Sequence, residues 1–247
     1  MSPKKLSLIY LHISIFLWGF TGIFGKIIQM SATMIVWYRL LITVVILLLI
    51  SLVSKKIILL KGKNLYRAVY IGFCVLVHWI LFYMAIKYSN ASVGLSCIST
   101  VAVFTAFLEP LITGKKFSPF NVLLASVAAV GMYLIFYFQE FYRTGILLGL
   151  AAAFISSYFT ILNSKLIKEV NSETVTIYEL GSALLFLTLL LPLYHFYLPN
   201  DALVPDFHNA QLLLVFSLLC TVIPFNLSLK SLKYISAFTS TLSVNLE

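Results

Sequence analysis

One permanent positive charge lies inside an otherwise apolar stretch of this chain. Arg39 belongs to a hydrophobic run that extends from Met34 to Val53. An isolated cation at the centre of a lipid bilayer costs about 2.5–3.5 kcal/mol on insertion scales. If the run spans a bilayer, the guanidinium should face a polar cavity or a partner, or else extend to the headgroups from its place near the end of the run. In the first case Arg39 would help to define a polar path or its gates.

Other polar or aromatic side chains interrupt apolar runs and could belong to the same site. They are Trp18, His78, Trp79, Tyr158, Asn163, Glu179 and Pro224. A histidine within a membrane can titrate near neutral pH and relay protons, and a proline there leaves a backbone carbonyl without its helical donor. Each residue also has a structural alternative: a histidine or amide that joins two helices, a proline kink, or an aromatic ring packed in the core.

The inventory of residues argues against an enzyme. The chain has no H-E-x-x-H, G-x-S-x-G, P-loop or G-x-G-x-x-G motif. Cys74, Cys97 and Cys220 all lie in apolar runs, as small core residues do, and no Cys/His cluster has the spacing of a metal site. The aspartates, Asp201 and Asp206, share one hydrophilic segment. We expect no catalytic residues, no metal and no cofactor.

The elements that must position these side chains are membrane helices. Of the 247 residues, 61% are hydrophobic and 10% are charged, whereas a soluble domain carries about 25% charged residues. Continuous apolar runs favour helices over the alternating strands of a barrel. The runs are Leu8–Ile27, Met34–Val53, Val69–Ile86, Ser92–Thr113, Asn121–Phe138, Gly145–Leu162, Thr174–His195 and Gln211–Leu229, and another extends from near Tyr234 to Glu247. The prediction is an all-α, multi-pass bundle.

The basic residues give this bundle an orientation. Of the 17 Lys and Arg residues, only Lys26, Lys87 and Arg143 fall on the side of the membrane opposite the N-terminus, and Arg39 lies within a run. The remainder fall on the N-terminal side, which the positive-inside rule assigns to the cytoplasm. This bias explains the formal charge of +9 through the lipid bilayer, so we expect no nucleic-acid partner.

The chain also contains an internal repeat. Phe20-Thr21 and Lys26 match Phe159-Thr160 and Lys165 at an offset of 139, Tyr38-Arg39-Leu40 aligns with Tyr178-Glu179-Leu180, and Cys74 and Lys87-Tyr88 match Cys220 and Lys233-Tyr234 at an offset of 146. Each repeat contains five spans, and five is odd, so the second copy enters the membrane from the opposite side. Residues 6–138 and 145–247 therefore form two inverted repeats, an arrangement typical of secondary transporters. Arg39 and Glu179 occupy equivalent places with opposite charge.

Several segments, in this order, resemble those of the EamA-type drug/metabolite transporters. They are FLWGFTGIFGK, WYRLL, AIKYSNASVGLSCISTVAVFTAFLEPLITGKKFS and LKYISAFTSTLSVNLE. The resemblance covers essentially the whole chain and implies ten helices in two five-helix repeats that move small metabolites, often as exporters. This sequence has Val101-Ala102 where the family often places proline. It also stops at Glu247 within the ninth run, so we expect a fragment or a truncated gene product.

Together these features predict a transporter of a small polar or amphipathic metabolite, an amino acid or similar compound, that works by alternating access in the efflux direction. Protons are the coupling ion we consider, and a homodimer is compatible with the pattern. We expect a bacterial plasma membrane with the N-terminus in the cytoplasm. The main alternative is a membrane protein that does not transport, either an assembly partner or a degenerate transporter fragment. A channel is a third interpretation.

Overall fold

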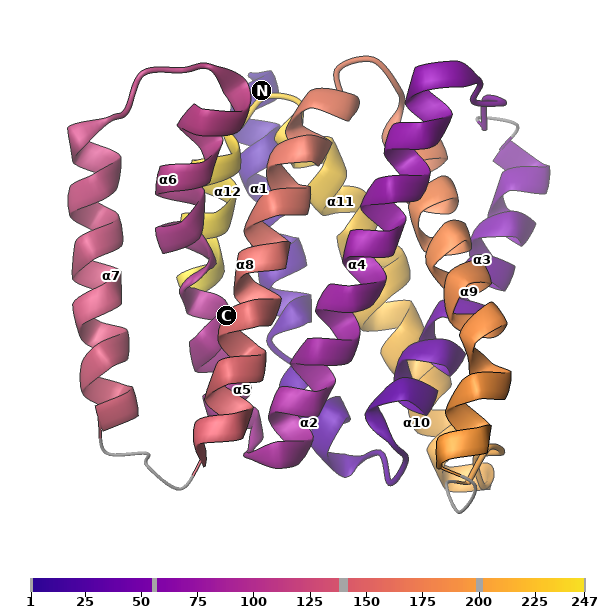
Figure 1. Ribbon diagram of the computed structural model, residues 1–247. Helices are drawn as coiled ribbons and strands as arrows, with labels where there is room; N and C mark the ends of the chain where they lie inside the picture. Colours follow the sequence, from indigo (N-terminus) through magenta and orange to yellow (C-terminus); the bar gives the residue numbers. More distant parts are fainter. Residues whose placement is uncertain (1, 55–56, 138–141, 199–201, 247) are drawn as a thin grey trace.

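The computed structural model describes residues 2–54, 57–137, 142–198 and 202–246, and these residues form helices and no strand. Figure 1 shows them side by side as one upright bundle. The helices are α1 (Pro3–Trp18), α2 (Thr21–Ile27), α3 (Ala32–Ser54), α4 (Gly62–Tyr88), α5 (Ala91–Ser99), α6 (Val101–Thr113), α7 (Pro119–Tyr137), α8 (Arg143–Leu166), α9 (Ser172–Tyr197), α10 (Phe207–Ser217), α11 (Ile223–Leu232) and α12 (Ala237–Ser243). A π turn, Leu218–Val222, joins α10 to α11.

Among the described residues, seven helical stretches are long and apolar enough to cross a membrane. Three of them consist of consecutive labelled helices: α1 with α2, α5 with α6, and α10 with α11. The expected span over 121–138 corresponds to α7, which contains the shorter apolar helix Pro119–Gly131; Phe138 lies outside the described residues, as does Glu247 at the end of the last expected run. The predicted multi-pass helical bundle is confirmed.

Helices that hold equivalent places in the chain run in opposite directions. In Figure 1, α1 descends from the N-terminus at the top, whereas α8 begins at the bottom and ends at the top. In the same way α3 ascends and α9 descends. The helix ends that meet at the top include the starts of α1 and α4 and the connections α6–α7, α8–α9 and α11–α12, and these ends carry the lysine-rich segments. One end of the bundle is thus basic, and we call it the basic end.

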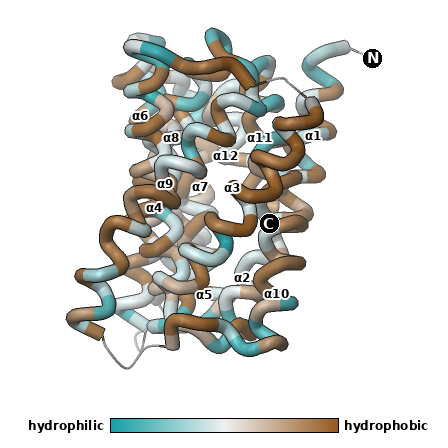
Figure 2. Tube along the Cα trace, turned by 90° about the vertical axis from the view of Figure 1, so that its right-hand side faces the viewer, coloured by the Kyte–Doolittle hydropathy of each residue, from teal (hydrophilic) through white to brown (hydrophobic). Residues whose placement is uncertain are grey.

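The outside of the bundle is apolar, as a surface in contact with lipid must be. Leu52, Leu147 and Leu189 are among the large hydrophobic side chains that are more than half exposed. Figure 2 shows hydrophobic residues along the length of the helices and hydrophilic residues gathered toward the two ends. Exposed leucines on these helices therefore face acyl chains.

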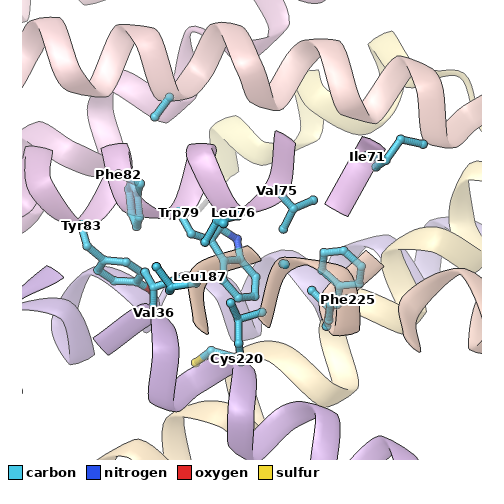
Figure 3. Packing of buried hydrophobic residues seen from close by; sticks show 14 of the residues in the cluster. Val36, Ile71, Val75, Leu76, Trp79, Phe82, Tyr83, Leu187, Cys220 and Phe225 are labelled. Carbon is cyan, nitrogen blue, oxygen red and sulfur yellow. The ribbon is translucent and has the colours of Figure 1, made fainter. Parts of the chain in front are cut away.

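The core forms where the two halves of the chain meet. Helix α4 packs most extensively against α8 and α9, which come from the second half. Figure 3 shows Trp79 of α4 with Val36 of α3, Leu187 of α9, Cys220 of the π turn and Phe225 of α11 around it. The helices come close at Gly72 of α4, where an added Cβ would overlap the backbone carbonyl oxygen of Glu179.

Candidate functional site

A cavity of about 120 Å³ lies between the two halves of the bundle. One water molecule occupies roughly 10–15 Å³ on the same measure, so the cavity accommodates a larger molecule. Its walls come from α1 to α6 on one side and from α8, α11 and α12 on the other. Among the predicted site residues, the cavity is lined by Trp18, Arg39, His78, Trp79 and Asn163.

Arg39 lies inside the bundle, with its side chain held by both halves. Its Nη1 donates to the Tyr83 hydroxyl (2.6 Å), its Nε to Thr221 Oγ1 (2.5 Å) and its Nη2 to the carbonyl oxygen of Cys220 (2.8 Å). The guanidinium carbon lies 3.9 Å from the centre of the Trp79 ring, a cation–π contact that stabilises a buried cation. The residue is 2% exposed, so its charge does not extend to the headgroups.

Pro224 contributes through the backbone and does not line the cavity. A proline has no N–H, so the carbonyl oxygen of Cys220, four residues earlier, lacks its usual helical donor. This oxygen accepts the hydrogen bond from Arg39, and the local backbone widens into the π turn. Pro224 thus lies four residues after the carbonyl that accepts from Arg39.

Glu179 and Asn163 form a buried pair on neighbouring helices. Asn163 Nδ2 donates to Glu179 Oε2 over 3.2 Å, and the two residues are 2% and 0% exposed. Within the described part of the chain, Glu179 Oε1 and Asn163 Oδ1 have no hydrogen-bond partner, and Glu179 forms no ion pair with Arg39 or another residue. Asn163 lines the cavity, whereas Glu179 lies outside the cavity lining.

His78 is fixed at the cavity wall. Its Nδ1 lies 2.8 Å from the carbonyl oxygen of Ala152, and a carbonyl can only accept, so Nδ1 carries a proton in this arrangement. The ring stacks on Phe82 and meets Phe159 edge-on. This bond joins α4 to α8, which matches the structural alternative for a histidine in a span, while the ring also lines the cavity.

The side of the helix on which a residue lies decides whether it lines the cavity. On α8 the lining residues Ser156, Phe159, Thr160 and Asn163 form one stripe at i, i+3, i+4 and i+7. Tyr158 is off this stripe and contacts Tyr70 instead. On α11 the stripe begins at Phe225, which leaves Pro224 off it.

The sequence reasoning missed Thr21, Phe159 and Phe225 as members of the cavity wall. A signal was present for two of them, because Phe20-Thr21 and Phe159-Thr160 are the identities that define the repeat. The Thr21 hydroxyl oxygen is buried without a hydrogen-bond partner in the described part of the chain. Matching positions of the two repeats therefore meet at one cavity.

Contacts at the basic end of the bundle hold the cavity wall on α12. Glu109 of α6 is 6% exposed; it accepts from Lys115 Nζ (2.8 Å) and, through Oε2, from the backbone N–H of Phe238 (3.1 Å) in the first turn of α12. Helix α12 carries Ser240 and Thr241 into the cavity lining. Among the described residues, no group of three or more His, Cys, Asp or Glu side chains could hold a metal ion.

The model of the EamA-like transporter family matches residues 5–137 and 143–247. The chain therefore belongs to the EamA-like transporter family, whose members are integral membrane proteins built from two repeats and transport small molecules. A crystal structure whose description names no particular protein is similar to this chain, with a TM-score of 0.73 and 15% sequence identity. The match covers 98% of this chain and 84% of the other. At that identity the likeness concerns the fold alone. Curated proteins give no match.

Proposed function

We propose that this protein is a secondary transporter that moves a small polar or amphipathic metabolite, an amino acid or a similar compound, by alternating access. The observation that carries the proposal is the cavity lined by both halves of the chain, which contains Arg39, His78 and Asn163 among aromatic, aliphatic and hydroxyl side chains. Buried cations and polar groups within a membrane mark solute pathways. Residues 6–138 and 145–247 are the two inverted repeats that would move against each other.

The composition of the wall supports a solute with both apolar and polar parts. Aromatic rings offer area for an apolar group, and a few fixed polar groups give orientation. Trp18, Phe159 and Phe225 supply the rings, while Thr21 and Asn163 present acceptor oxygens without partners in the described part of the chain. A metabolite with N–H or O–H donors satisfies these oxygens.

The direction we propose is efflux across a bacterial plasma membrane, with the N-terminus in the cytoplasm and protons as the coupling ion. The concentration of lysines at the basic end of the bundle supports this orientation. The carboxyl group of Glu179, which is buried beside the cavity, and the imidazole of His78 in the cavity wall supply proton carriers.

Transport into and out of vesicles, measured against a panel of metabolites, tests the proposed function. We expect Arg39→Ala, His78→Ala and Glu179→Ala each to lower the flux of the transported metabolite by about tenfold, which corresponds to about 1.4 kcal/mol. Leu147→Ala, which changes a lipid-facing side chain on α8 that is 68% exposed, is the matched control and should keep the flux. Equal flux in the wild type and all three site variants would refute the assignment of the site.

The alternative is a membrane protein that does not transport. It predicts that no metabolite of the panel crosses faster than in empty vesicles, even though the protein folds and inserts. Saturable flux in the wild type rejects this alternative. A channel, in turn, would give flux that does not saturate and labelling from both sides at once.

A further inference from the structure

The buried pair of Asn163 and Glu179 has an unusual balance of donors and acceptors. One hydrogen bond, from the amide nitrogen to Oε2, joins the two side chains. The other oxygen of each side chain has no donor within the described part of the chain. A buried acceptor left unsatisfied costs about 1–3 kcal/mol. The pair is therefore short of one hydrogen, which either a proton or a ligand donor can supply.

Within the described part of the chain, no nearby charge removes this shortage. Of the helices packed on α9, α4 places the Cys74 thiol near Glu179, α3 contributes Arg39 and α11 contributes Lys230. Arg39 is bound to Thr221, Tyr83 and Cys220, and Lys230 pairs with Glu173 over 2.9 Å. The other titratable side chains of α4 that flank this level are held elsewhere: Arg67 by Glu169, Tyr70 beside Tyr158, and His78 by Ala152.

The protonation state of Glu179 decides whether the amide oxygen of Asn163 is available to a solute. When Glu179 is a carboxylate, the NH₂ group of Asn163 faces it, as it does here, and Oδ1 has no donor within the described part of the chain. When Glu179 carries a proton on Oε1, that O–H can donate to Oδ1 while the NH₂ group keeps its bond to Oε2. Because Asn163 lines the cavity, the proton of Glu179 and a donor of the solute compete for Oδ1.

We propose that Glu179 is a proton-binding site and that Asn163 transmits its state to the cavity through Oδ1, which accepts either from protonated Glu179 or from a solute. With Glu179 ionised, Asn163 presents an acceptor and favours a solute that carries an amine or another N–H donor. With Glu179 protonated, Oδ1 accepts from Glu179, and such a solute loses its partner. Proton and amine-bearing solute then bind at the expense of each other, which is the condition for exchange. This inference rests on the proposed transport function and assigns its coupling site to Glu179 rather than His78.

Infrared difference spectroscopy of the protein in lipid nanodiscs tests the proton site without a substrate. As the pH falls, a band of a protonated carboxyl group should grow in the wild type. Glu179→Gln should remove one titrating carboxyl group per chain, and Asn163→Leu should shift the band to higher frequency because its hydrogen bond is lost. Glu169→Gln, at a carboxylate 51% exposed in its side chain, is the control and should leave this band unchanged.

A spectrum of Glu179→Gln in which the same buried carboxyl band titrates would overturn the inference. If that variant does not fold, the shift in Asn163→Leu decides, and an unshifted band refutes the proposed bond. Proteoliposomes loaded with a pH-sensitive dye and exposed to a mixture of the standard amino acids separate the two proposals. Metabolite flux that keeps its pH dependence in Glu179→Gln contradicts the coupling site and leaves the transporter intact. A titrating Glu179 without flux of any metabolite contradicts the transport function alone.

Discussion

At the scale of the residue, the central feature is Arg39, a buried cation that is hydrogen-bonded by residues from both halves of the chain. Sequence reasoning placed Arg39 in an apolar run and could not choose between a cavity and the headgroups. The choice depends on Thr221 and the carbonyl of Cys220, about 180 residues away along the chain, and such pairings cannot be read from spacing. The sequence did indicate Pro224, because a proline in a span removes the usual helical donor of one carbonyl.

Pro224→Ala tests this relation between backbone and side chain. An alanine supplies an N–H that competes with Arg39 for the carbonyl of Cys220, so the hydrogen bond from the guanidinium to that carbonyl weakens. A hydrogen bond to a charged group contributes about 1.5–3 kcal/mol. Binding of the transported metabolite should weaken by about tenfold, measured by calorimetry in detergent. Affinity equal to that of the wild type would show that the freed carbonyl does not hold Arg39 in place.

At the scale of the element, the helices and their order were predictable from hydropathy, while the phase of each helix was not. Tyr158 and Pro224 were expected at the site because they lie in the right spans. They are off the cavity stripes of α8 and α11 by one position, which turns a side chain by about 100°. The breaks at Gly19-Phe20, at Thr100 and in the π turn change the phase within a span, so periodicity counted from the helix start fails beyond them.

Gly72→Ala tests the closest helix contact. A Cβ there would overlap the carbonyl oxygen of Glu179 in the backbone of α9, and backbone atoms cannot turn aside as a flexible side chain does. We expect a loss of about 1–3 kcal/mol in the free energy of unfolding, the usual cost of overpacking, measured by denaturation in detergent micelles. Gly181→Ala on α9 is the matched control, since an added Cβ there has nothing within 4 Å. Equal stability of the two variants would contradict this packing.

At the scale of the whole molecule, two halves of one chain enclose the cavity from opposite sides. The ion pairs among described residues, Arg67–Glu169, Lys115–Glu109 and Lys230–Glu173, belong to elements that meet at the basic end of the bundle. The first of them joins the two halves, and Glu109 joins them through α12. The repeat made this arrangement predictable, because an odd number of spans per copy reverses the second copy.

The most direct test of the account is the side of the membrane on which Lys26 and Lys165 lie. These residues occupy equivalent repeat positions, and both side chains are exposed. Lys26→Cys and Lys165→Cys would be introduced singly and labelled in intact cells with a membrane-impermeant maleimide; the native cysteines are buried. We predict that Lys26→Cys reacts from outside and that Lys165→Cys reacts only after the membrane is permeabilised. Labelling of both from the same side would contradict the inverted repeats and the transport cycle built on them.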